Sequence, residues 1–268
     1  MAIITISRGS YSRGMDVAEK VAEKLGYDCI GREALLQTSR EYDVAEVKLV
    51  RTTQDTTSVL DSLIGGKERY AAHIQAALTS RVKKDNVVYH GLAGQFLLQG
   101  VSHVLKVRII APLEYRINIV MDRDNVEKQQ AIRILKKDDE ERNRWSRKLF
   151  LIDPRDCNLY DLVLNIDKCT VVDAVDLICH TAGFKGFQTT PESQKAMDDL
   201  QLACAVKVRL VDVRPNVEVS ADNGNISVIA DAPVTQEEAV TREIERIAKT
   251  VPGVDDVLVQ VRRLASQD

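Results

Sequence analysis

A short apolar run that leads through a glycine-framed loop into a helix is the feature that most constrains the fold of this chain. Residues 2–7, AIITIS, have the composition of a buried strand, and Gly9 and Gly14 follow in the spacing G-x-x-x-x-G. Apolar residues then recur at helical spacing until Gly26, a helix stop signal. Such a loop can present backbone N–H groups and the positive end of the helix dipole to an anion. The stretch therefore favours a phosphate-binding loop, although a tight turn that needs small residues gives the same spacing.

The side chains after the second glycine depart from the usual phosphate-binding pattern. That pattern places a lysine there, which reaches the terminal phosphates, followed by a hydroxyl that ligates Mg²⁺. This chain has Met15 and Asp16 instead, and neither can do this in the ordinary way. Arg8 and Arg13 can supply positive charge from other backbone positions, and the alternative is that each is a solvated surface arginine. The predicted loop residues are Arg8, Gly9, Ser10, Tyr11, Ser12, Arg13, Gly14, Met15 and Asp16.

Three further apolar, β-rich runs predict the rest of a sheet. They lie at 86–91, 103–112 and 160–166, and helical pattern separates them. Continuous apolar strands that alternate with helices are typical of a parallel sheet with helices on both faces. The predicted fold class is therefore α/β, with a three-layer α/β/α arrangement around a parallel sheet.

Helical segments complete this part of the chain. Residues 33–84 predict a polar-rich helical excursion without a buried strand, and the charged, glycine-free stretch 126–149 favours helix. A further helix is expected at 170–183, where Thr170 and Asp173 have the spacing of a capping box.

A segment rich in Gly, Thr, Pro and Ser at 183–193 marks a domain boundary. We predict one domain over 1–182, a linker over 183–194 and a small α+β domain over 195–268.

The second domain has the pattern of an α-β-β-α-β unit. The sequence DNG between two alternating runs is a strong hairpin signal, and TQEE at 235–238 predicts a capping box. The expected elements are helices at 195–213 and 235–250 and strands at 216–221, 226–231 and 254–264.

Charge and cysteine content exclude several classes of protein. The net charge of −3 gives no general attraction to nucleic acid, because non-specific binding depends on many Lys and Arg contacts to phosphate. The five cysteines are never spaced C-x-x-C, so we expect buried reduced thiols and neither a disulfide framework nor a metal site. No apolar stretch approaches the roughly 20 residues of a membrane span and no signal-peptide pattern begins the chain, so we expect a soluble, cytoplasmic protein.

The first 182 residues resemble the cytidylate kinase-like family of P-loop nucleoside monophosphate kinases. The resemblance is collinear and rests on ITISR with its loop, AEKVAEKLGY, GREALL, VRIIAPLEYRI, AIRILKKDDEERNRWSRKLF and LYDLVLNI. It implies a core sheet, a helical monophosphate-binding insertion over about 36–84 and a lid over about 123–157. It also implies a nucleotide as the partner, and transfer of the γ-phosphoryl group from ATP, with Mg²⁺, to a nucleoside monophosphate such as CMP.

The resemblance assigns catalytic roles to arginines of the lid and of the segment APLEYR. In the family these arginines close over the phosphates, and the matching residues here are Arg116, Arg142 and Arg147. Residues 138–141 of the same stretch are all acidic, so a solvated helix with ion pairs four residues apart is an equal alternative.

This chain departs from the family pattern in ways that affect catalysis more than nucleotide binding. Met15 stands where a basic residue is expected, Gly31 replaces an acidic residue, and Leu92 falls where relatives often carry an arginine. Catalysis would need Arg13 to stand in for the absent lysine. The resemblance also makes Arg32 a candidate substrate-binding residue.

Residues 195–264 resemble a BON domain. The segments that carry this resemblance are VKVRLVDVRPNVEVSADNGNISVIADAP and TQEEAVTREIERIAKTVPGVDDVLVQV, with VPGV before the last strand. Such domains are associated with binding to phospholipid surfaces or other ligands and are not catalytic. Arg262 and Arg263 form only a weak basic pair, which favours an adaptor role over direct membrane binding.

Two functions follow from the two resemblances. The first is a nucleotide-binding kinase that uses ATP with Mg²⁺ and is coupled to a BON domain. The alternative is a catalytically impaired pseudo-kinase that senses a nucleotide such as AMP or ATP and acts through the BON domain. A third reading, a scaffold with a vestigial loop, predicts no nucleotide binding. The sequence leaves open the base preference, the BON ligand (a phospholipid surface or a small molecule) and whether the chain forms an oligomer.

Overall fold

The computed structural model describes residues 2–31, 66–91 and 93–263. Arg32, Leu92 and most of the predicted insertion therefore lie outside the described residues. The chain divides into two compact units, one formed by 1–37 and 84–190 and the other by 38–83 and 191–268. The assignment of domains made from the sequence stays a prediction.

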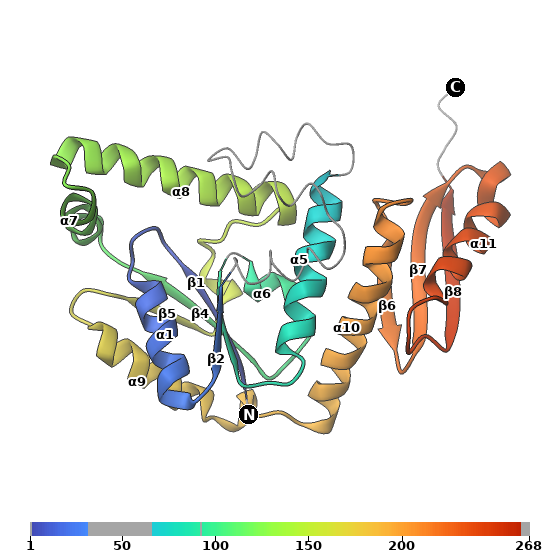
Figure 1. Ribbon diagram of the computed structural model, residues 1–268, viewed down its shortest axis with the longest axis horizontal. Helices are drawn as coiled ribbons and strands as arrows, with labels where there is room; N and C mark the ends of the chain where they lie inside the picture. The colour runs from blue at the N-terminus through green and yellow to red at the C-terminus, as the bar shows by residue number, and fades with distance from the viewer. Residues whose placement is uncertain (1, 32–65, 92, 264–268) are drawn as a thin grey trace. The chain divides into compact units, whose positions relative to one another are not determined.

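The first unit is built on a five-stranded sheet in the order β2-β3-β1-β4-β5, with every neighbouring pair parallel (Figure 1). This confirms the predicted parallel α/β sheet. Strand β2 was not predicted, because it is short and carries exposed residues rather than an apolar run. The strands are β1 (Ile3–Arg8), β2 (Asp28–Gly31), β3 (Val87–His90), β4 (Val104–Ile110) and β5 (Leu162–Asn165).

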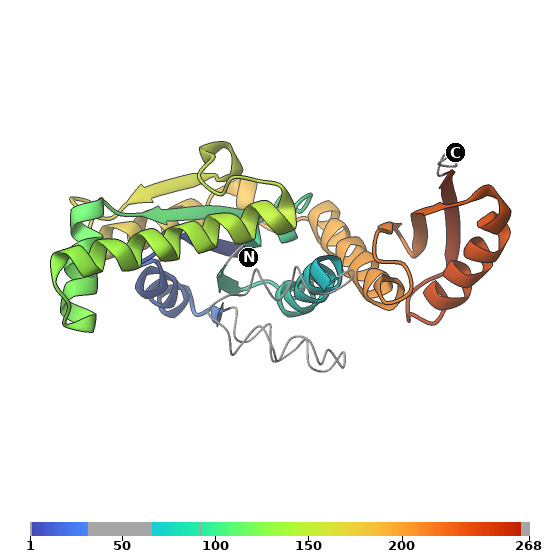
Figure 2. The ribbon, with the colours of Figure 1, turned by 90° about the horizontal axis from the view of Figure 1, so that it is seen from above.

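Helices cover both faces of this sheet. Helices α1 and α9 pack against each other over one face. Helix α6 packs on the other face, where a β-carbon on Gly94 would lie 3.1 Å from Cβ of Thr5. Helix α8 lies along the edge at which the strands end (Figures 1 and 2). The helices are α1 (Gly14–Leu25), α6 (Gly94–Leu97), α7 (Leu113–Asp124), α8 (Lys128–Phe150) and α9 (Val171–Ala182), with short 3₁₀ turns η2 (Cys157–Leu159) and η3 (Lys185–Phe187).

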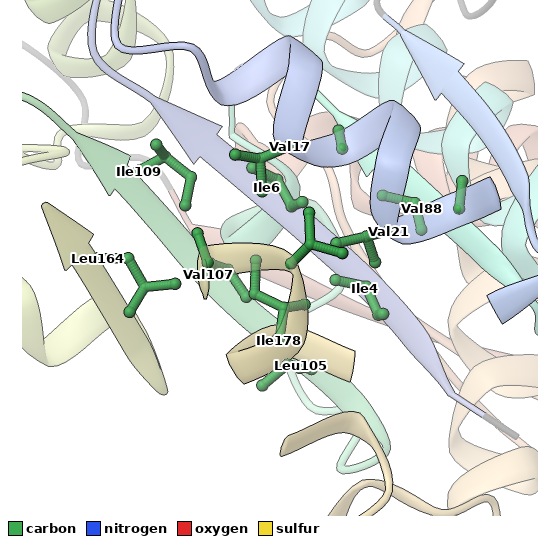
Figure 3. Close-up of a cluster of buried hydrophobic side chains, with 14 of the residues drawn as sticks. Ile4, Ile6, Val17, Val21, Val88, Leu105, Val107, Ile109, Leu164 and Ile178 are labelled. Atoms are coloured by element: carbon green, nitrogen blue, oxygen red, sulfur yellow. The ribbon is translucent and has the colours of Figure 1, made fainter. Parts of the chain in front are cut away.

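The main core of the first unit lies between the sheet and the helix pair α1 and α9. Side chains alternate along a strand, so every second residue of β1 and β4 points into this layer. The layer contains only aliphatic side chains at its centre (Figure 3), among them Ile4, Ile6, Val17, Val21, Val88, Leu105, Val107, Ile109, Leu164 and Ile178. Strand β1 is therefore buried and fixed at the middle of the unit.

Local signals at helix ends were confirmed in two cases and wrong in one. Gly26 ends α1 in the left-handed conformation, and Thr170 and Asp173 form the expected capping box of α9. The capping box expected at 235–238 is not formed. There, η4 (Val234–Gln236) precedes α11 (Glu237–Ala248), and Gln236 caps the helix without a side-chain hydrogen bond.

The second unit contains the expected α-β-β-α-β series. Its sheet has the order β6-β7-β8; β6 and β7 form an antiparallel hairpin, and β7 and β8 are parallel. The hairpin turn places Asn223 and Gly224 at positive φ, which confirms the DNG signal. Besides α11, its elements are α5 (Gly66–Val82), α10 (Pro191–Val211), β6 (Glu218–Asp222), β7 (Asn225–Ala232) and β8 (Asp256–Arg263).

Two apolar clusters hold the second unit together. The larger lies between the sheet and helices α10 and α11 and includes Leu210, Val228 and Ile244. In the smaller, α5 contributes Ala76 and α10 contributes Cys204. Among the described residues, no helix is both long and apolar enough to cross a membrane.

Candidate phosphate-binding cleft

The loop between β1 and α1 is anchored to the neighbouring strand. The amide of Gly9 donates to the carbonyl oxygen of Ile109 on β4 at 3.0 Å. The hydroxyl of Ser12 donates to the same carbonyl at 3.1 Å and to the carbonyl of Gly9 at 3.0 Å. Since β1 is the central strand, these bonds fix the loop at the carboxyl edge of the sheet.

The backbone of the loop is strongly curved. Tyr11 and Arg13 adopt the left-handed conformation, with φ of 56° and 62°, which non-glycine residues seldom do. Gly14 begins α1, and a β-carbon there would lie 2.6 Å from Cβ of Arg8, so this position excludes any side chain. The first-turn amides of α1 have no acceptor within the helix and carry its positive dipole end. The local geometry is compatible with an anion-binding turn.

A cleft of about 580 Å³ opens beside this loop. Its walls come from the loop, the ends of β1 and β4, and α7 and α8. Of the residues predicted as the site, Arg8, Gly9, Arg116 and Arg142 line the cleft. Five arginines in all line it, and among the described lining residues Asp139 is the only carboxylate, so the cleft favours an anionic ligand.

Arg116 joins α8, the helix of the predicted lid segment, to the loop. One guanidinium nitrogen, Nη1, donates to the carboxylate of Asp139 on α8 at 2.8 Å and to the carbonyl of Ser10 at 3.3 Å. Its Nε is buried, and so is the hydroxyl of Ser10; neither has a hydrogen-bond partner within the described chain. Buried polar groups are normally paired. These two atoms are therefore unsatisfied polar groups at the junction of the loop and α7.

The remaining predicted residues lie elsewhere. Arg13 forms an ion pair with Asp16, so its charge is engaged by its own helix. Met15 is 42% exposed on the first turn and does not line the cleft. Arg147 pairs with Asp153 at 2.8 Å. The phenol of Tyr11 accepts a hydrogen bond from Arg123 at 3.0 Å.

Ion pairs shape the turn after α8. Asp153 accepts hydrogen bonds from Arg155 and Arg147, and these bonds, chiefly those of Arg155, hold the pKa of its carboxyl well below the usual range. Arg155 also lines the cleft. Two exposed arginines are thereby tied to one carboxylate.

Sequence reasoning did not identify Arg108 or its neighbour Tyr160 as site residues. Arg108 lies on β4 and lines the cleft, and Tyr160 precedes β5 and contacts Arg108. The one signal for Arg108 is a charge inside the otherwise apolar run VRII. The expectation of buried thiols was also wrong in part: only Cys204 is buried, whereas Cys29 and Cys157 are exposed.

The described residues hold no group of three or more His, Cys, Asp or Glu side chains that could hold a metal ion. Mg²⁺ in nucleotide sites is usually held by one or two carboxylates together with phosphate oxygens and water. Asp139 is the residue of the cleft that fits this role. The residues present are therefore compatible with a metal that arrives with a nucleotide.

The strand order, the anchored loop and the flanking helices define a P-loop kinase type of α/β fold. The chain belongs to the cytidylate kinase-like family, whose model matches residues 3–168. It is 26% identical over 193 residues to a cytidylate kinase of Pyrobaculum islandicum, covering 69% of this chain and 97% of the relative. Its likeness to a cytidylate kinase of Methanocaldococcus jannaschii is 31% identity over 99 residues, which span 36% of this chain and only 55% of that relative.

A solved structure shows the same fold. An uncharacterized protein from Eubacterium ventriosum superposes with a TM-score of 0.52 at 19% identity, covering 68% of this chain and 98% of the other. At that identity the likeness concerns the fold alone.

Proposed function

We propose that the first unit binds a nucleotide by its phosphates in the cleft and is a nucleoside monophosphate kinase. The reaction would move the γ-phosphoryl group of ATP, with Mg²⁺, to a monophosphate such as CMP. The observation that carries the proposal is the cleft beside the anchored loop, which five arginines line and in which Asp139 is the only carboxylate among the described lining residues. The similarity to cytidylate kinases supports the choice of CMP.

The residues of the cleft suit this chemistry. Phosphoryl transfer needs positioned cations around the transferring group and exclusion of water, and little covalent help. Arg8, Arg116 and Arg142 supply cations from the loop and the lid, and the loop amides would hold the phosphate. Mg²⁺ would neutralise charge between the phosphates, with Asp139 available to it or to its waters.

The test is calorimetric titration of the full chain with ATP, AMP and CMP, each with and without Mg²⁺. The proposal predicts saturable binding of ATP and CMP, and formation of ADP and CDP when both are present. An Arg116→Ala variant should weaken binding about tenfold or more, since a charged hydrogen bond contributes roughly 1.5–3 kcal/mol. Arg242, exposed on α11, provides the matched control Arg242→Ala. No binding of any of these nucleotides would overturn the proposal.

One observation favours the pseudo-kinase as a second candidate. The position of the usual lysine holds Met15, and Arg13, the expected substitute, is paired with Asp16 and does not line the cleft. This candidate predicts nucleotide binding with negligible turnover. Met15→Lys should then raise turnover, whereas an Arg13→Ala variant should leave any residual rate unchanged. A clear loss of rate in the Arg13 variant would instead assign Arg13 the role of the lysine.

We also propose that the second unit is a BON domain that acts as an adaptor. Its α-β-β-α-β order supports the assignment as a BON domain. Arg262 is already paired with Glu218 at 2.9 Å and with Asp231 at 3.0 Å, which weakens its attraction to an anionic membrane surface. The full chain should therefore fail to sediment with vesicles of phosphatidylglycerol and phosphatidylcholine. Co-sedimentation that disappears in high salt would assign a phospholipid ligand instead.

We further propose that the protein is cytoplasmic and has no nucleic-acid partner, which fits its net charge of −3.

A further inference from the structure

Arg108 stands at the base of the phosphate-binding loop. Strands β1 and β4 are in register so that Arg108 lies beside Ser7, and the next residue, Ile109, accepts the hydrogen bonds of the loop. Neighbouring residues of paired strands project from the same face of a sheet. Both Ser7 and Arg108 line the cleft, whereas Ile109 points into the core on the other face.

Tyr160 holds the guanidinium of Arg108 in place. The phenol oxygen of Tyr160 accepts from Nη1 of Arg108 at 3.3 Å and from the amide of Gln95 at 3.0 Å, and its own proton is donated to the carbonyl of Pro154 at 2.8 Å. The guanidinium carbon also lies 5.5 Å from the centre of the tyrosine ring. Nη1 makes a further, long contact of 3.5 Å with the hydroxyl of Ser7.

The charge of Arg108 has no acidic partner among the described residues. Its partners are the neutral oxygens of Tyr160 and Ser7. By contrast, Arg116 pairs with Asp139, and Arg155 pairs with Asp153. A half-buried cation without a counter-ion is costly unless an anion completes the site.

We infer that Arg108 binds the phosphate chain of the nucleotide and takes the place of the lysine that the loop lacks. This inference rests on the proposed function, because it presumes a nucleotide in the cleft. Tyr160 is then a positioning residue that aims the guanidinium. A cation fixed in the floor of the cleft adds most to ligands with several charges, so Arg108 selects nucleoside triphosphates over monophosphates and nucleosides.

The test compares Arg108→Lys with Arg108→Met. The two variants lose the same forked group and have stems of similar length, but only the lysine keeps the charge. Calorimetry gives the affinities for ATP, AMP and adenosine within each variant. The ratio of ATP to adenosine affinity is the readout, because partial loss of structure would lower both affinities and leave that ratio unchanged. Arg108→Met should reduce the ratio about tenfold or more, and Arg108→Lys should retain most of it.

Each outcome decides the inference. Equal ratios in wild type and both variants, with normal ATP binding by the wild type, would overturn the role of Arg108 and leave the proposed function standing. No ATP binding by the wild type would overturn the proposed function itself. If Arg108→Met does not fold, Tyr160→Phe replaces it: this change keeps the ring and removes the oxygen, and it should lower ATP affinity without changing adenosine affinity. An unchanged ratio of ATP to adenosine affinity in Tyr160→Phe would then overturn the inference.

Discussion

Gly14 and Gly9 frame the same loop but have different surroundings. A β-carbon on Gly14 would lie 2.6 Å from Cβ of Arg8, which belongs to the base of that side chain and cannot swing away. A β-carbon on Gly9 would make only ordinary contacts, at 3.9 Å or more. The protein around Gly9 thus has room for a β-carbon, and the protein around Gly14 does not.

We therefore expect Gly14→Ala to destabilise the protein by about 1–3 kcal/mol through overpacking, despite the better helix propensity of alanine. Gly9→Ala should leave the free energy of unfolding nearly unchanged. Urea denaturation of both variants measures this difference, with Gly186→Ala as a control because its β-carbon would meet nothing within 4 Å. Equal stability of the Gly14 and Gly9 variants would contradict the close approach.

Single residues also show what sequence reasoning can reach. Gly26, Thr170 and Asn223 signal the ends of their elements through short-range chemistry, and all three were predicted correctly. Arg108 was missed because its place in the cleft depends on the pairing of Ser7 with a residue 101 positions away. The register of two strands that are distant in sequence cannot be predicted from either segment alone.

Elements differ in how well their own sequence defines them. Strand β1 is a continuous apolar run and helix α1 has apolar residues at helical spacing, and both were found. Strand β2 has exposed residues and is defined by its pairing with β3. The start of α11 was misplaced because the residues of the expected cap form the 3₁₀ turn η4 instead. A capping box also requires the helix to begin at the right residue, which depends on how the preceding turn packs.

Helix α10 and the turn η2 place two thiols in opposite surroundings. Burial raises the pKa of the Cys204 thiol to about 12, whereas Cys157 is exposed and lines the cleft. At pH 8 a thiol reagent should therefore label Cys157 in the native protein and Cys204 only after denaturation, because the thiolate is the reactive form. Peptide mass spectrometry gives the two rates. ATP should slow labelling of Cys157, and rapid labelling of Cys204 in the native state would contradict the packing of α10.

At the scale of the whole molecule, the buried pair His103 and Asp85 lies near the start of strands β4 and β3. His103 is fully buried, and its Nε2 lies 3.1 Å from Oδ1 of Asp85, out of hydrogen-bonding alignment. The other carboxylate oxygen of Asp85 accepts a hydrogen bond from Thr189 at 2.5 Å. Burial lowers the pKa of His103, and the Asp85 carboxylate opposes this effect without cancelling it.

This pair predicts how stability depends on pH. Because the pKa of His103 is lower in the folded than in the unfolded chain, its contribution is fully present above the unfolded value near 6.5 and is lost as the pH falls through the folded value. His103→Gln should remove this part of the pH dependence, about 1.4 kcal/mol for each pKa unit of lowering. Urea midpoints at pH 7 and pH 5 measure it, with His180→Gln as the exposed control. A pH dependence in His103→Gln equal to that of the wild type would contradict the prediction.

The central position of β1 has a consequence for how the protein exchanges its amide hydrogens with solvent. Strand β1 is paired with β3 on one side and β4 on the other. The loop that follows β1 is held by a hydrogen bond from the amide of Gly9 to the carbonyl oxygen of Ile109 on β4. The amides of β1 exchange mainly when the sheet opens, and a ligand that binds only the folded form lowers the exchange rate by the same factor by which it raises the folding equilibrium constant. A nucleotide at the loop should therefore protect amides throughout the sheet, including those of strands it never touches.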